Sequence, residues 1–137
     1  MSTNPTSDVL PWSAAAPLLT EQLAAFRDAR RLGDEAAAWR ALEWEHILSQ
    51  PYMLPHLASH WHMLAYAVEL RNWRESAGHA LRLLLVPLGS LTGRLPEGNS
   101  GRASVSAFRP MPVPGALALR IEEARKALSK APQSDPS

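Results

Sequence analysis

Apolar residues recur every three or four positions along most of this chain, and helix-ending residues interrupt them at intervals. This period is that of amphipathic α-helices. The first run lies between Ser13, a candidate cap, and Leu32. Gly33 follows it and suits the left-handed position that ends a helix, while Asp34 suits the cap of the next helix. Two helices joined by so short a link must fold back antiparallel.

Further breaks divide the rest of the chain. Pro51 and Pro55 separate the second helix from the third, because proline is tolerated in the first turn of a helix but not in its interior. Asn72 suits the cap of a fourth helix, which we expect to stop near Pro87. The helical period returns near Ala116. The pattern therefore predicts helices over residues 13–32, 34–50, 55–71, 73–87 and 116–130.

A weak internal repeat favours helical hairpins. Residues 31–48 and 69–86 align at an offset of 38, which pairs Asp34 with Asn72. A period of roughly 34–40 residues built of two helices is typical of tetratricopeptide-like repeats. The full motif of those repeats is absent, and a four-helix bundle fits the pattern equally well. The predicted fold is therefore all-α, with antiparallel helical hairpins in one of these two arrangements, a long loop and a C-terminal helix.

The length of 137 residues allows one domain. Residues 87–114 lose the helical period and are rich in glycine and proline, so they form a long loop that is either functional or disordered. Because this loop keeps several apolar residues, we expect an ordered strap across the helices. The predicted organisation is a flexible segment at 1–12, a helical domain at 13–130 and a disordered tail at 131–137.

Composition excludes several classes of protein. The absence of cysteine rules out disulfides, thiolate metal sites and cysteine nucleophiles. A formal net charge of +1 argues against a surface for nucleic acid or anionic membranes. No apolar run is long enough for a membrane span, and the first residues lack a signal-peptide pattern. We therefore expect a cytoplasmic protein that binds neither nucleic acid nor membranes.

All five histidines lie between His46 and His79. His56 and His60 are four residues apart on the predicted third helix, so both rings project from one stripe. Two imidazoles at this spacing can share one metal ion. His62 lies on a different side of the same helix.

The second helix adds a carboxylate and an imidazole. Glu43 and His46 have the E-x-x-H spacing by which helix-bundle metal proteins place both groups on one ion. His46 lies near the end of its helix and His56 near the start of the next, so they share one end of the hairpin. Glu43, His46, His56 and His60 are therefore the predicted metal ligands. Without thiolates, the expected ion is divalent Zn, Fe, Ni, Co or Cu.

Glu75 and His79 on the fourth helix form a weaker candidate pair. If this helix packs beside the third, His79 supplies another ligand or a partner of one. The alternatives are that Glu75 completes a capping box with Asn72 and that His79 is a half-buried surface residue. Four tryptophans in the same region form either a dry shell around a site or ordinary core. They are Trp39, Trp44, Trp61 and Trp73.

Three segments together resemble a small bacterial family known only as a domain of unknown function. They are EHILSQPYMLPHLASHWHML (45–64), RNWRESAGHALRL (71–83) and PEGNSGRASVSAFRPMPVP (96–114). The last is the most specific, with GNSG where the family typically has G-N-T-G. The resemblance covers about residues 20–120 and brings no activity with it.

The resemblance also implies which residues belong to the family pattern. An acidic residue and a histidine on the second helix, with a histidine pair on the third, correspond to Glu43, His46, His56 and His60. Family members often have Gln at position 79, so the resemblance does not extend to His79 as a ligand.

Three functional hypotheses follow. The first is a small protein that binds a divalent transition metal through His46, His56 and His60, with Glu43 as a fourth ligand or as a hydrogen-bonding partner of a ligand. The second is a tetratricopeptide-like module that binds a partner protein. The third is a cofactor-free enzyme acting on a small molecule, in which His46 paired with Glu43 is a general base. Burial of His56 and His60 among apolar neighbours on all sides would favour the second.

Overall fold

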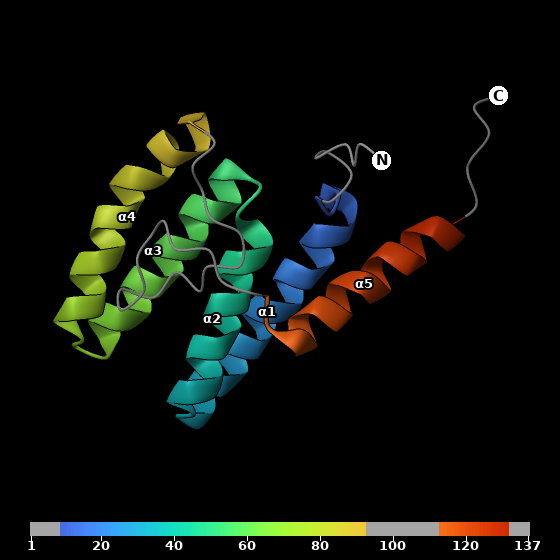
Figure 1. Ribbon diagram of the computed structural model, residues 1–137. Coiled ribbons are helices and arrows are strands. Elements are labelled where there is room, and N and C mark those ends of the chain that lie inside the picture. The colour runs from blue at the N-terminus through green and yellow to red at the C-terminus, as the bar shows by residue number, and fades with distance from the viewer. Residues whose placement is uncertain (1–8, 93–112, 132–137) are drawn as a thin grey trace.

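A computed structural model describes residues 9–92 and 113–131. These residues form five α-helices and contain no strand, so the predicted all-α class is confirmed (Figure 1). The helices are α1 (Trp12–Leu32), α2 (Glu35–Ser49), α3 (Met53–Glu69), α4 (Trp73–Thr92) and α5 (Gly115–Lys130).

Three of the predicted helix caps form as the local sequence predicts. Gly33 adopts the left-handed conformation with φ of 72°, and its N–H bonds to carbonyls of the last turn of α1. The Asp34 side chain accepts a hydrogen bond of 3.0 Å from the Ala37 N–H at the start of α2. Asn72 caps α4 in the same way, by accepting the Glu75 N–H at 3.2 Å. These caps satisfy backbone groups that the helix itself leaves unpaired.

Two predicted boundaries are wrong. Helix α4 passes through Pro87 and ends at Thr92, because one proline removes one intrahelical hydrogen bond and strains one turn without obliging the helix to stop. Helix α1 begins at Trp12, with Pro11 rather than Ser13 at the capping position. The central part of the predicted strap, 93–112, and the terminal segments 1–8 and 132–137 lie outside the described residues.

The helices pack as two neighbouring hairpins. Helix α1 packs mainly on α2, α3 packs mainly on α4, and α2 joins the hairpins by packing on α3. Helix α5 lies against α1, so α4, α3, α2, α1 and α5 follow one another across the molecule in Figure 1. The pair α2 and α3 is therefore the centre of the structure.

Apolar side chains form two separate cores. One joins the first half of α1 to the end of α2 and to Leu117 of α5. The other joins the second half of α1 to α2 and α3 and includes Trp39, Leu42, Met63 and Tyr66. Next to this second core, the buried residues of α2, α3 and α4 include four histidines. No helix in the described part of the chain is long and apolar enough to cross a membrane.

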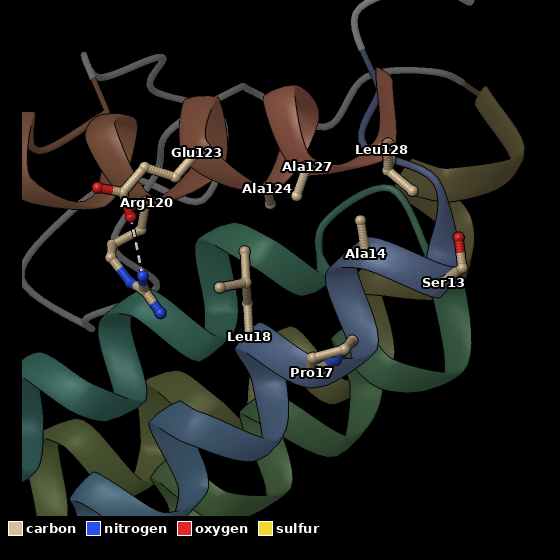
Figure 2. A pocket seen from close by; sticks show the side chains of 9 residues that line it. All are labelled: Ser13, Ala14, Pro17, Leu18, Arg120, Glu123, Ala124, Ala127 and Leu128. Atoms are coloured by element: carbon tan, nitrogen blue, oxygen red, sulfur yellow. Dashed lines mark hydrogen bonds and ion pairs between the residues drawn. The ribbon is translucent and has the colours of Figure 1, made fainter. Parts of the chain in front are cut away.

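A groove of about 470 Å³ lies between α1 and α5 (Figure 2). Leu18 and Ala124 line it from opposite sides, and Arg120 pairs with Glu123 at one end. No histidine contributes to its lining. The groove is therefore separate from the histidine-rich region.

We expect Gly33→Ala to lower the free energy of unfolding by about 1 kcal/mol, because a side chain is disfavoured at a positive φ. Space is not the reason, since an added Cβ at Gly33 meets nothing within 4 Å. Gly115→Ala is the matched control, because its Cβ also meets nothing and Gly115 has no positive φ. Urea unfolding measures both variants. An equal loss in both would contradict this account of the α1–α2 link.

Candidate metal centre

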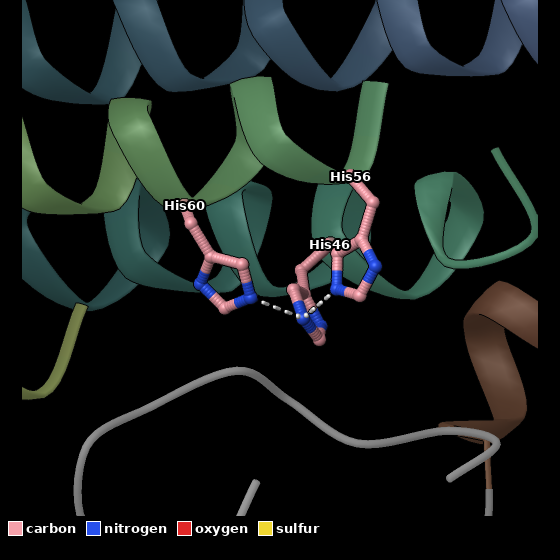
Figure 3. Close-up of side chains that lie close together, drawn as sticks. All are labelled: His46, His56 and His60. Carbon is pink, nitrogen blue, oxygen red and sulfur yellow. Dashed lines mark hydrogen bonds between the residues drawn. The ribbon is translucent and has the colours of Figure 1, made fainter. Parts of the chain in front are cut away.

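Three imidazoles from two helices meet where α2 packs on α3. His46 comes from α2, and His56 and His60 come from neighbouring turns of α3 (Figure 3). The Nε2 atom of His46 lies 2.9 Å from Nε2 of His56 and 3.2 Å from Nε2 of His60. All three side chains are buried, with at most 3% of each residue exposed. The structure thus brings together three of the four residues that the sequence singled out.

The short link between α2 and α3 explains this convergence. Three residues join the helices, so the last turn of α2 lies beside the first turns of α3. Two small buried residues, Ser49 and Ser59, stand three positions after His46 and His56 and donate hydrogen bonds to their carbonyl oxygens. Each hydroxyl is satisfied within its own helix, so neither competes for the imidazole nitrogens.

The spacing of the nitrogens suits a metal ion. Two nitrogen ligands at ordinary metal distances lie about 3.3 Å apart in a tetrahedral site and about 2.9 Å apart at right angles. The two measured Nε2 separations fall at or between these values. Within the described ranges, this is the one group of three or more potential ligands whose donor atoms all lie within 4.8 Å of one another.

Burial also keeps two rings of α3, His56 and His60, neutral. It lowers the pKa of His56 to about 4. It lowers the pKa of His60 as well, and the neighbouring His46 and His56 add to the effect because their charges would repel. A neutral imidazole keeps the lone pair that a metal ion needs. At neutral pH these two groups are therefore in the state that binds metal.

A second line of contacts runs from His60 into α4. Nδ1 of His60 lies 3.4 Å from Nδ1 of His79, and Nε2 of His79 lies 3.1 Å from Oε2 of Glu75. His79 is fully buried, so its interpretation as a half-buried surface residue is wrong. The Glu75 carboxylate binds this ring, while the Asn72 N–H donates to the Ala67 carbonyl, so the capping box is not reciprocal.

These contacts determine the positions of the ring protons. A carboxylate accepts, so Nε2 of His79 carries a proton and its Nδ1 carries a lone pair. That lone pair accepts a hydrogen bond from the protonated Nδ1 of His60, so the lone pair of His60 lies on Nε2. Nε2 is the atom that faces His46. The chain from Glu75 to His60 thus directs a lone pair into the three-histidine group.

The positions of two glutamates of α2, Glu43 and Glu45, differ from the prediction. Glu43 is half-buried, and the structure does not bring it into the group of three histidines. The buried carboxylate is instead Glu45, whose Oε1 lies 2.6 Å from Nδ1 of His62 and whose hydrogen bond raises the pKa of that ring. His62 does lie outside the group, as its helical position predicted. Spacing alone gave no signal for this pair, because its two members stand on different helices.

The tryptophans do not form a shell. Trp39 is buried and stacks on His79, with ring centres 6.2 Å apart and an angle of 19° between the planes. Trp44 is partly buried and packs against the core near α5. Trp61 and Trp73 are 61% and 65% exposed. Of the four, Trp39 alone has a ring contact with a histidine in the described structure.

Residues 13–121 match the family described as Protein of unknown function (DUF3703). The chain belongs to this family. The DUF3703 match spans α1 to α4 and the first part of α5, so all the buried histidines lie inside the family unit. Membership in a small uncharacterised family is thereby confirmed. No curated protein and no solved structure shows a significant match to this DUF3703 chain.

We expect the metal-free protein to lose stability as the pH falls from about 6.5 towards 4. The folded state holds His56 neutral while the unfolded chain takes up a proton, so this contribution is complete above pH ~6.5. His62 acts in the opposite direction, because its raised pKa favours the folded state at low pH. Urea unfolding of wild type and His56→Asn, with chelator present, measures the dependence. An unchanged slope in the variant would refute the assignment to His56.

Proposed function

We propose that this protein binds one divalent transition-metal ion through the Nε2 atoms of His46, His56 and His60. The observation that carries the proposal is the meeting of three buried Nε2 atoms at 2.9 and 3.2 Å. Such a group is costly without an ion, because three buried Nε2 atoms that face one another cannot all pair a donor with an acceptor. A cation satisfies all three lone pairs at once.

Counting protons supports the same conclusion. With a lone pair on Nε2 of His60, one proton on Nε2 of His46 serves that contact. Nε2 of His56 then has two options. It accepts a second hydrogen bond from the same N–H of His46, or it carries its own proton, and two N–H groups face each other. In addition, Nδ1 of His56 is buried and has no hydrogen-bond partner among the described residues. A metal ion removes the conflict between the three Nε2 atoms.

The donor set indicates the class of ion. Three imidazole nitrogens and no thiolate suit Zn, Fe, Ni, Co or Cu. Three protein ligands leave at least one coordination position. Glu43 remains the proposed fourth ligand or hydrogen-bonding partner, since it stands one turn before His46 on α2.

His79 and Glu75 are proposed here as residues that position His60, and no longer as ligands. Both ring nitrogens of His79 are directed at other groups, one at Glu75 and one at His60. Carboxylate–histidine pairs of this kind orient metal ligands and raise their basicity. Arg82 lies beside them, buried, and its charge interacts with the Glu75 carboxylate.

The geometry favours this proposal over the two alternatives from the sequence. In a purely structural scaffold, His56 and His60 would face apolar groups, whereas here their Nε2 atoms face a third imidazole. A general base needs access to substrate, but His46 is 3% exposed and its Nε2 lies between two rings.

Elemental analysis of protein purified without a histidine tag tests the proposal. We expect one metal ion per chain in the wild type and none in the His56→Ala/His60→Ala double variant. His62→Ala is the matched control, because His62 lies on the same helix but outside the group, and we expect it to keep the metal. A wild type that neither contains metal nor binds added Zn²⁺ or Co²⁺ in calorimetry would refute the proposal.

Glu75→Gln tests the positioning role of Glu75. We expect metal affinity to fall by roughly 10–100-fold, because the His79 ring loses the carboxylate that fixes its proton. Glu45→Gln is the matched control, since Glu45 is also a buried carboxylate bonded to a histidine, but outside the group.

Two measurements read out these variants. Competition titration with Co²⁺ gives the affinity, and ¹⁵N NMR of the metal-free protein gives the ring protonation. We expect the proton of His60 on Nδ1 in the wild type, and a changed distribution in Glu75→Gln. A proton on Nε2 of His60 in the wild type, or equal losses of affinity in both variants, would contradict the role of Glu75.

A further inference from the structure

Helix α4 turns polar side chains inward and apolar side chains outward. Among the α4 side chains that the structure describes, the buried ones are all polar or charged: Glu75, Ser76, His79 and Arg82. By contrast, Trp73 is 65% exposed, Leu81 is 56% exposed and Leu84 is 76% exposed. An amphipathic helix ordinarily buries its apolar stripe. The hydrophobic effect alone therefore does not account for the inner face of α4.

The buried charges of α4 lie on one stripe that faces the histidines of α3. Glu75, His79 and Arg82 stand at intervals of four and three, which places them on one side of the helix. Nδ1 of His79 lies 3.4 Å from Nδ1 of His60, so this side is turned towards α3. The pKa of His60 is lowered by burial and by neighbouring positive charges that include Arg82. Arg82 is thus close enough to act on a ligand of the proposed metal centre.

The burial of Arg82 calls for negative charge around it. Arginine is almost never fully buried unless it is paired, and Arg82 is 6% exposed. Burial lowers the pKa of Arg82, and the charge of the Glu75 carboxylate opposes this effect. The same carboxylate also accepts a hydrogen bond from Nε2 of His79. A guanidinium has five N–H donors in a planar fork, which is more than this shared carboxylate can accept, so Arg82 can bind a further anion.

A metal ion in the three-histidine group makes the need for an anion greater. A divalent ion adds two positive charges, while its imidazole ligands are neutral and Arg82 and Glu75 balance each other. If Glu43 joins the ion, it supplies one negative charge, and one positive charge remains. An uncompensated charge is costly in a buried site. A ligand with one negative charge at the open coordination position removes this cost.

We infer, on the basis of the proposed function, that the metal centre binds a small carboxylate anion with Arg82 as its second point of attachment. One oxygen of the carboxylate coordinates the ion at the position that the three histidines leave open. The other oxygen accepts hydrogen bonds from the guanidinium, which is always charged and presents its donors in a rigid plane. The single charge of a carboxylate matches the one positive charge that remains, whereas a phosphate dianion exceeds it.

Acetate binding to the Co²⁺-loaded full chain tests the inference. The Co²⁺ content is measured first by elemental analysis, so that failure of the metal site is recognised separately. Acetate is then titrated in a sulfonate buffer while the visible absorption of Co²⁺ is recorded. We expect a saturable spectral change with acetate and none with acetamide, which has nearly the same shape but no charge.

Substitutions of Arg82 test its part in binding the anion. Arg82→Gln is expected to keep Co²⁺, because removing a nearby positive charge does not disfavour a cation, but to weaken acetate binding by roughly 10–100-fold. Arg82→Lys keeps the charge but not the planar fork, so we expect a smaller loss of acetate affinity. Arg74→Gln is the matched control, because Arg74 is an exposed arginine of the same helix, and we expect wild-type affinity.

The outcomes separate this inference from the proposed function. A wild type that holds Co²⁺ without responding to acetate, or equal acetate affinities in Arg82→Gln and Arg74→Gln, would overturn the inference and leave the metal site standing. A wild type that holds no Co²⁺ overturns both. Far-UV circular dichroism shows whether each variant folds, and if Arg82→Gln does not, Arg82→Lys decides: acetate affinity equal to that of Arg74→Gln then refutes the role of Arg82.

Discussion

The packing of α2 against α3 determines the rest of this structure. Along one half of the contact, Trp39, Leu42 and Met63 are buried and hold the two helices at a fixed separation. Along the other half, imidazoles fill the same space, with Nε2 atoms 2.9 and 3.2 Å apart. Interiors are close-packed, so the apolar half fixes the distance at which His46 meets the rings of α3.

Two histidines of this structure are each hydrogen-bonded to a glutamate, and the depth of burial gives the two pairs different roles. His62 pairs with Glu45 and remains about one-third exposed, so the carboxylate raises the pKa of the ring and favours its charged form. His79 pairs with Glu75 in the interior and passes the preference for one tautomer to His60. The first pair resembles a surface ion pair, whereas the second orders a buried polar group.

Helix α3 has two contrasting faces. Its inner face presents His56 and His60 to α2, and its outer face exposes Leu54, Trp61 and Val68 to solvent. Trp61 stands about 100° round the helix from His60, so it is exposed rather than part of a shell around the histidines.

Local chemistry was sufficient to predict the helices and the shared end of the α2–α3 hairpin. Gly33, Asp34 and Asn72 act within one turn of the chain, so their effects can be read from neighbouring residues. The short link likewise placed His46 near His56. Spacing along a helix gives the direction of a side chain about the axis of that helix, and no more.

The rotation of each helix against its neighbours depends on contacts across the whole interface, which only the tertiary structure supplies. It determined that Glu45 rather than Glu43 is the buried acid of α2 and that His79 lies fully inside. It also left Trp61 and Trp73 on the surface. The sequence by itself therefore determined the helices and the three histidines that share one end of a hairpin. Side-chain packing between helices decided which acids, rings and faces accompany them.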